Sequence, residues 1–364
     1  MVKAARSAID GLSAAEHAFM IPLQRVTRPL DGFFNVLGAA VNGEGMLATF
    51  ACLYWCWDQH KCISGIWLVP MQEVANGIAK WITRRGRPGW VEPRIRIAAW
   101  SSEFSFPSSH TQLVTSVAYY MVFASAHSQA VSVTPALLPF AFAAVVGFSR
   151  VSVGLHYPSD VLLGGAWGAA CSELWIALVP TLLDRYDLLR GGGWATPAGA
   201  ALSTPARLGL LFLPMVCTAL ALAAGYRHVR KSAGLDPPEW NKRACSGKYA
   251  ARTLDPRGVP LGNYTGMCGV LAGLAVGSLF MKPAWSPADP QYYMQPLQYP
   301  ASTRDSVLRA IFGNFFMVVG FEGIAAITPR KPLAVYSVLR FIKYMFVPVY
   351  ILLIAPPAFQ YFGV

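Results

Sequence analysis

Long apolar segments are the feature that most constrains how this chain can fold. They lie within 33–57 and at about 62–79, 111–127, 131–149, 158–183, 206–226, 261–281, 307–327 and 334–359. Several approach the roughly 20 residues that a helix needs to cross a bilayer, although the first and third are marginal. Only 13% of the residues are charged, about half the fraction of a soluble domain. The sequence therefore predicts an all-α, polytopic membrane bundle of about 8–9 transmembrane helices.

The apolar pattern divides the chain into three parts. Residues 1–32 have a mixed composition and are expected to form an N-terminal surface segment, such as an amphipathic helix. Residues 33–190 contain the first five spans and all the motifs described below, and residues 191–364 form a C-terminal transmembrane region. The apolar piece 18–23 is too short for a secretory signal. The spans themselves are therefore expected to target the chain to the membrane.

The net charge and the spacing of the cysteines indicate which partners and cofactors to expect. The formal net charge is +12, but the Lys and Arg residues flank apolar segments instead of forming stripes interleaved with aromatic residues. Basic residues at such positions direct membrane topology or contact anionic head groups. Membrane lipid is therefore an expected partner and nucleic acid is not. The seven Cys include no CxxC pair, so neither a metal site nor a cofactor is expected.

Residues 149–160 gather a cation, an imidazole and a carboxylate between two apolar segments. Pro158 favours the first turn of a helix, which places Asp160 inside that turn. His156 and Asp160 are four residues apart, a spacing at which a carboxylate can hold an imidazole if the turn is helical. Our hypothesis is that His156 is a nucleophile, that Asp160 orients it, and that Arg150 binds the anion it attacks.

Residues 80–88 close the second predicted span with a basic sequence. Lys80 and Arg87 are seven residues apart and Pro88 follows, so both cations share one face if the helix continues for two turns. The simpler interpretation is a positively charged helix end that serves topology.

Residues 107–110, Pro-Ser-Ser-His, precede the third predicted span. A Ser at a helix start caps the backbone, and the free N–H groups there can bind an anion. Ser108 and Ser109 would then donate to an anion beside His110. The simpler interpretation is a helix cap followed by a histidine at the membrane interface.

The three motifs lie on one side of the membrane by the span count, and together they suit phosphoryl transfer. Such a reaction spreads charge over the equatorial oxygens of phosphorus, which fixed cations and hydrogen-bond donors stabilise. One histidine would attack the phosphorus and the other would protonate the leaving oxygen. His156 is the better nucleophile candidate, because Asp160 lies at orienting distance from it.

The pattern Lys80-x6-Arg87-Pro88, Pro107-Ser-Ser-His110 and Ser149-Arg-x5-His-x3-Asp160 resembles the three-part signature of the type 2 phosphatidic acid phosphatase superfamily. The resemblance covers residues 80–160. It implies metal-independent, two-step hydrolysis of a phosphomonoester through a phosphohistidine on His156, with His110 as the general acid. The implied phosphate-binding residues are Lys80, Arg87, Ser108, Ser109 and Arg150. Ser109 departs from the pattern, since many members carry Gly there.

Within the superfamily, the chain most resembles the sphingosine-1-phosphate (long-chain-base phosphate) phosphatases. The shared features are two spans before the first motif, the lead-in Ser102-Glu-Phe-Ser-Phe-Pro-Ser108, a multi-span carboxyl half and the ending Arg340-Phe-Ile-Lys-Tyr344. This implies an amphiphilic phosphorylated lipid as substrate, a role in sphingolipid metabolism and the endoplasmic reticulum membrane. That family generally has its site on the lumenal or outer face. The motif-bearing side here holds 23 of 30 Lys and Arg, which indicates the cytoplasmic side, so the orientation stays open.

Other functions remain compatible with these residues. The same pocket could hydrolyse an isoprenoid diphosphate or a sugar phosphate. From a different class, an anion carrier could use Lys80, Arg87 and Arg150 but would have no need for the pair of His156 and Asp160. The sequence leaves the oligomeric state open.

Overall fold

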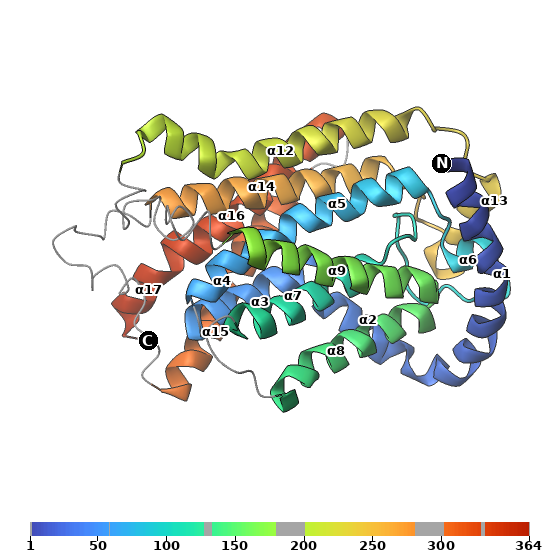
Figure 1. The fold of residues 1–364 in the computed structure, drawn as a ribbon, viewed down its shortest axis with the longest axis horizontal. Coiled ribbons are helices and arrows are strands. Elements are labelled where there is room, and N and C mark those ends of the chain that lie inside the picture. The colour runs from blue at the N-terminus through green and yellow to red at the C-terminus, as the bar shows by residue number, and fades with distance from the viewer. Residues whose placement is uncertain are drawn as a thin grey trace. The chain divides into compact units, whose positions relative to one another are not determined.

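The computed structural model describes residues 2–57, 59–126, 133–179, 201–280, 302–328 and 332–363, and within these ranges it contains helices but no strands (Figure 1). The helices are α1 Val2–Thr27, η1 Arg28–Leu30, α2 Asp31–Ala40, α3 Gly43–Cys56, α4 Gln59–Ile66, α5 Leu68–Thr83, α6 Pro88–Val91, α7 Ser109–Ala126, α8 Val133–Ser152, α9 Pro158–Val179, α12 Thr204–Arg230, α13 Pro238–Ala244, η3 Gly247–Tyr249, α14 Gly258–Phe280, α15 Thr303–Ala326, α16 Leu333–Val349, the π-helical turn Tyr350–Ile354 and α17 Ala355–Phe362. The predicted all-α class is confirmed.

Five helical segments among the described residues are long and apolar enough to cross a membrane: Pro158–Leu178, Thr204–Arg230, Gly258–Phe280, Thr303–Ala326 and Leu333–Phe362. A sixth is present if the broken pair Ser13–Ala40 and Gly43–Cys56 counts as one span, and Leu137–Ser152 is a shorter apolar helix. These helices support a polytopic membrane protein, with fewer clear spans than the sequence predicted. The predicted boundary between residues 190 and 191 lies outside the described residues.

Two predicted spans are interrupted in the structure. The span within 33–57 consists of α2 and α3, which are separated at Val41 and Asn42 before Gly43. The span at 62–79 consists of α4 and α5, which are separated at Trp67. Pro70 lies in the first turn of α5, where its missing N–H costs no helical hydrogen bond. Hydropathy alone does not register such breaks, because the residues on both sides are apolar.

The described chain forms two compact units. One comprises Met1–Asn42, Gln72–Glu173 and Ala221–Leu261, and it contains all three motifs. The other comprises Gly43–Met71, Leu174–Leu220 and Gly262–Val364. In this second unit, α15 packs against α3 and α16, and the Trp55 indole donates to the carbonyl of Ile351 over 3.1 Å.

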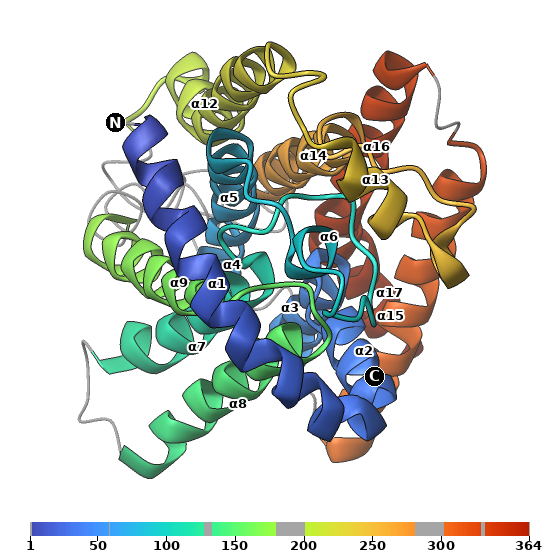
Figure 2. The ribbon, with the colours of Figure 1, turned by 90° about the vertical axis from the view of Figure 1, so that its right-hand side faces the viewer.

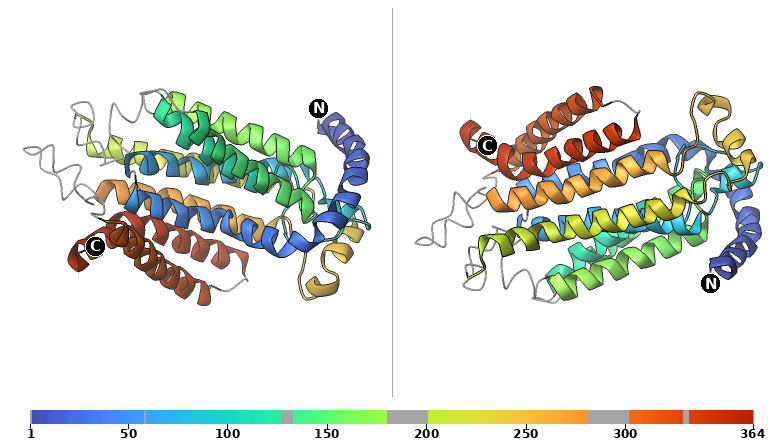
Figure 3. Two further views of the ribbon diagram at one scale, coloured as in Figure 1. Left: turned by 90° about the horizontal axis from the view of Figure 1, so that it is seen from below. Right: turned by 90° about the horizontal axis from the view of Figure 1, so that it is seen from above.

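In the motif-bearing unit, α1 runs across the ends of α8 and α9 (Figures 1 and 2). Figure 3 shows the same crosswise course from two further sides. Met20 of α1 is fully buried against Ile95, Val151 and Tyr157. The Gln24 amide donates to the carbonyls of Arg96 and Ser152. These contacts fix the N-terminal helix onto the loops that carry the motifs.

Helices α7 and α9 approach each other closely where the motifs meet. A Cβ on Gly164 would lie 2.5 Å from the carbonyl oxygen of Ser108, and one on Gly168 would overlap the carbonyl of Gln112. The two glycines are four residues apart, so they face α7 on successive turns of α9. This approach lets the Ser108 N–H donate to the Asp160 carbonyl over 3.0 Å, which joins the second motif to the third.

Candidate active site

Lys80 lies in the last turn of α5 and is buried. Its Nζ donates to Glu103 Oε2 over 2.5 Å and to Ser109 Oγ over 3.2 Å. The first motif thus meets the lead-in to the second motif and the first residue of α7. Glu103 was part of a quoted sequence pattern, but sequence reasoning gave it no role.

Arg87 joins the first motif to the lead-in of the second motif and to the third motif. Its Nε donates to the Glu103 carbonyl over 2.6 Å, its Nη1 to the Leu155 carbonyl over 2.9 Å, and its Nη2 to the Phe104 carbonyl over 3.3 Å. The same Nη1 lies 3.3 Å from Nε2 of His156. Arg87 also occupies the N-cap position of α6, where its side chain makes no capping hydrogen bond, and Pro88 lies in the first turn. A planar guanidinium held by three carbonyls has a fixed direction, and this one faces the His156 ring.

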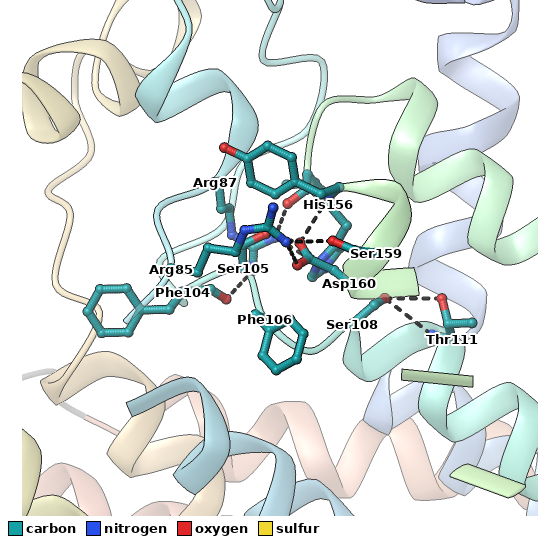
Figure 4. A network of polar contacts seen from close by, with 12 residues as sticks. Arg85, Arg87, Phe104, Ser105, Phe106, Ser108, Thr111, His156, Ser159 and Asp160 are labelled. Carbon is teal, nitrogen blue, oxygen red and sulfur yellow. Dashed lines mark hydrogen bonds and ion pairs between the residues drawn. The ribbon is translucent and has the colours of Figure 1, made fainter. Parts of the chain in front are cut away.

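The His156 ring is buried between Arg87 and Asp160 (Figure 4). Its Nδ1 lies 3.5 Å from Asp160 Oδ2, while Nε2 faces Arg87. A carboxylate beside Nδ1 favours the tautomer that carries its proton there, and this leaves a lone pair on Nε2. The backbone carbonyl of Arg150 accepts the N–H groups of Leu155 and His156. This turn connects Arg150, near the end of α8, to His156, just before the start of α9.

The Asp160 carboxylate is fully buried and saturated with donors. Oδ2 accepts from the Tyr157 N–H over 2.9 Å and from the Ser105 hydroxyl, while Oδ1 accepts from Arg85 Nη1 over 2.6 Å. Sequence reasoning missed Ser105 and Arg85. Arg85 lies within the first motif between Lys80 and Arg87, but nothing in the sequence indicates that it contacts residue 160.

Arg150 and Ser108 are engaged in contacts other than those the sequence hypothesis describes. The Arg150 guanidinium is buried, with Nη2 donating to the Phe34 carbonyl of α2 and Nε to Ser149 Oγ. The Ser108 hydroxyl pairs with Thr111 Oγ1 at 3.1 Å and accepts from the Thr111 N–H, which is a helix cap. The simpler interpretation of Ser108 therefore describes its contacts in this structure.

His110, in the first turn of α7, is half-buried. Burial first, and then the positive charge of Arg150 and the neighbouring His156, Lys80 and Arg87, hold its pKa well below the usual range. The same physics lowers the pKa of His156 to about 4, through burial and then the charge of Arg87, against the raising effect of Asp160. Both imidazoles are thus neutral in this cationic pocket at pH 7.

Glu103 balances part of this positive charge. Burial alone raises a carboxyl pKa, but the ammonium of Lys80 and the charge of Arg87 outweigh it and lower the pKa of Glu103. Within the described residues, no group of three or more His, Cys, Asp or Glu side chains is arranged to hold a metal ion. The cationic side chains that act on His110 at this site are Arg150, Lys80 and Arg87.

Part of this chain is similar to known proteins. Residues 61–184 match the family model described as the PAP2 superfamily. Two proteins of Mycobacterium tuberculosis, from strains CDC 1551 / Oshkosh and ATCC 25618 / H37Rv, are each 37% identical over 104 residues, or 28% of this chain. Both are named decaprenylphosphoryl-5-phosphoribose phosphatase, and the match spans 53% of their length. No solved structure matches the chain significantly. The family model and the two relatives together support a PAP2-superfamily relationship for residues 61–184, the segment that carries all three motifs.

Proposed function

We propose that this chain is a membrane-embedded phosphoric monoester hydrolase that removes phosphate from an amphiphilic substrate through a phosphohistidine on His156. The observation that carries the proposal is the placement of the His156 ring, with Nδ1 beside Asp160 and Nε2 beside Arg87. A phosphoryl group bound by Arg87 would lie next to the lone pair that attacks it. The match of residues 61–184 to the PAP2 superfamily supports the same reaction class.

In the proposed first step, Nε2 of His156 forms a bond to phosphorus while the bond from phosphorus to the ester oxygen breaks. His110 gives its proton to that oxygen. Burial and the nearby cations hold the pKa of His110 well below its usual range, but a bound phosphate dianion offsets those cations and favours the imidazolium. Lys80 and Arg87 hold the phosphoryl oxygens, and Arg150, Ser108 and Ser109 complete the set that the signature implies.

In the second step, water attacks the phosphorus of the phosphohistidine, and neutral His110 accepts a proton from that water. The P–N bond breaks, its electron pair returns to Nε2, and inorganic phosphate leaves. Asp160 stabilises the positive charge that the His156 ring carries while phosphorylated. Cationic side chains supply the charge stabilisation, so we propose that no metal is required. Activity should therefore persist in EDTA, and a complete loss that zinc or magnesium restores would overturn this part.

For the substrate, we propose an amphiphile whose head group enters the polar site while its apolar chain stays among the membrane helices. The leading class is a long-chain-base phosphate or a phosphatidate-like lipid, in the endoplasmic reticulum membrane, and the lead-in Ser102–Ser108 supports it. A second class is a phosphorylated sugar on a polyprenyl carrier. The name of the two mycobacterial relatives favours this second class.

The test is phosphate release by the purified full chain in lipid or detergent. The panel comprises a long-chain-base phosphate, phosphatidate, a polyprenyl-linked phosphosugar, an isoprenoid diphosphate and a soluble sugar phosphate. We expect release from at least one amphiphilic phosphomonoester, abolished by His156→Ala. Unchanged release by that variant would contradict the mechanism. Anion transport without hydrolysis would favour a carrier.

A further inference from the structure

A second ion pair lies directly behind the proposed catalytic pair. Arg85 is buried between two carboxylates, those of Asp160 and Glu16. Figure 4 shows the Asp160 side of this arrangement. On one side its Nη1 donates to Asp160 Oδ1 over 2.6 Å and to Ser159 Oγ over 2.8 Å. On the other side its Nη2 donates to Glu16 Oε2 over 2.5 Å and to Ser13 Oγ over 3.1 Å. The guanidinium carbon also lies 3.7 Å from the centre of the Tyr157 ring.

Glu16 contributes from α1, outside the segment that matches the family model. Its Oε2 pairs with Arg85, and its Oε1 accepts the Ser159 N–H over 2.8 Å. That N–H is one of the donors at the start of α9 that have no partner within their own helix. Glu16 therefore both neutralises Arg85 and caps the helix that presents Asp160.

We infer that Arg85 and Glu16 are positioning residues, which act through Asp160 to fix the orientation and charge balance of His156. This inference rests on the proposed role of His156 as the nucleophile. The chain of charges runs from Glu16 to Arg85, then to Asp160 and to His156, and each neighbour has the opposite sign once the imidazole becomes positive. The N-terminal helix is therefore a functional part of the site.

The charge alternation gives the two residues opposite effects on the proton affinity of His156. The positive charge of Arg85 partly offsets the Asp160 carboxylate and so reduces how strongly Asp160 stabilises a protonated His156. Glu16 offsets the charge of Arg85 and so restores the stabilisation of protonated His156 by Asp160. Removing Arg85 should make His156 easier to protonate, whereas removing the charge of Glu16 should make it harder. A purely structural role for either residue does not produce shifts of opposite sign.

Other charged groups also face this assembly, and they stay unchanged in the variants proposed below. Those that act on His156, on Asp160 or on their immediate neighbours are Lys80, Arg87, Glu103, His110, Arg150, His17 and Tyr157. The charges of Glu16 and Arg85 also act on His17 and Tyr157, so the variants are compared through the opposite signs of their shifts and not through the size of one shift.

The chain offers a matched control for the loss of an ion pair to the N-terminal region. Asp31 at the start of α2 pairs with Arg96, with Oδ1 accepting from Nη2 over 3.1 Å. Like the pair of Glu16 and Arg85, it joins the N-terminal segment to the loops that carry the motifs. Neither partner contacts Asp160. Asp31→Asn therefore shows how activity changes when an ion pair to the N-terminal segment is lost while Glu16, Arg85 and Asp160 stay unchanged.

The experiment measures kcat, KM and the pH profile of kcat/KM for the full chain and for Glu16→Gln, Arg85→Gln and Asp31→Asn. We expect kcat to fall about tenfold in Glu16→Gln and Arg85→Gln, with KM within about twofold of the parent. The acid limb should move by about one pH unit, upward for Arg85→Gln and downward for Glu16→Gln. Asp31→Asn should leave the acid limb in place.

Arg85→Lys keeps the experiment decisive if Arg85→Gln does not fold. It retains the charge but not the planar fork, so kcat should fall while the acid limb stays within about 0.3 pH unit of the parent. Acid limbs that coincide in Glu16→Gln and the parent, or that move the same way in Glu16→Gln and Arg85→Gln, would overturn the inference. His156→Ala in the same series separates the two proposals. If it stays active, the proposed nucleophile is wrong. If it is inactive while the acid limbs of Glu16→Gln and Arg85→Gln coincide with that of the parent, only the positioning role is contradicted.

Discussion

Asp160→Asn is the substitution that most directly probes how His156 becomes a nucleophile. The carboxylate now accepts from Arg85, Ser105 and the Tyr157 N–H, and it lies 3.5 Å from His156 Nδ1. An asparagine whose oxygen stays on Arg85 would turn its NH₂ group toward Nδ1. The ring would then carry its proton on Nε2, which removes the lone pair that faces Arg87.

The size of the effect follows from the charge that develops on the ring. A unit charge pair at 3.5 Å interacts by about 5 kcal/mol at an effective dielectric constant of about 20. Losing that stabilisation from the transition state corresponds to roughly 3.5 orders of magnitude in rate. Arg85 already draws on the same carboxylate, which lowers the expected loss in kcat to between about 100-fold and 1,000-fold.

The assay is phosphate release by purified Asp160→Asn, with competitive inhibition by inorganic phosphate measured in parallel. A phosphate inhibition constant close to that of the parent shows that Lys80 and Arg87 still form the pocket. The thermal midpoint identifies any variant that fails because a buried charge network was broken. A kcat within threefold of the parent, with the pocket intact, would refute the role assigned to Asp160.

Three further outcomes follow from the geometry. Because burial and Arg87 lower the pKa of His156 to about 4, the nucleophile is neutral above that pH. After correction for protonation of the substrate phosphate, whose second pKa is about 6, kcat/KM should therefore lose activity through His156 only below a pH of about 4. An acid limb near a pH of about 6.5 that remains after this correction would contradict the low pKa of His156. In Arg87→Lys the ammonium cannot donate to three carbonyls and also face Nε2 of His156, so kcat/KM should fall about 100-fold in steady-state assays. Activity near that of the parent would contradict the role of the Arg87 guanidinium in holding the phosphoryl group beside His156. Gly168→Ala forces a methyl group against the Gln112 carbonyl and should lower the free energy of unfolding by about 1–3 kcal/mol. Gly209→Ala is the control, because its methyl group meets open space, and it should not lower that free energy. Equal shifts of the melting temperature in the two variants would contradict the close approach of α7 and α9.

Periodicity and hydropathy were enough to predict the helical class, because apolar segments near 20 residues have few alternatives in lipid. The breaks before Gly43 and at Trp67 were not predictable in this way. Short interruptions leave mean hydropathy almost unchanged, although Asn42 and Gly43 are a local turn signal.

The site was predictable where its contacts are local in sequence. The spacing of His156 and Asp160 indicated their proximity, and the structure places Nδ1 and Oδ2 3.5 Å apart. Glu16 and Arg85 are 69 residues apart, and no periodicity relates them. Their pairing follows only from the course of α1 across the ends of α8 and α9. Likewise, the engagement of the Ser108 hydroxyl by Thr111 depends on where α7 begins.

The central claim is a covalent phosphohistidine on His156. The most direct measurement is rapid acid-free quenching of the purified chain with a substrate labelled with ³²P in its phosphate, followed by peptide mapping. The account predicts alkali-stable, acid-labile label on the peptide that contains His156, absent from His156→Ala and retained longer in His110→Ala, whose slower hydrolysis step preserves the intermediate. Phosphate release at the rate of the parent with no label on that peptide, or label that persists in His156→Ala, would contradict it.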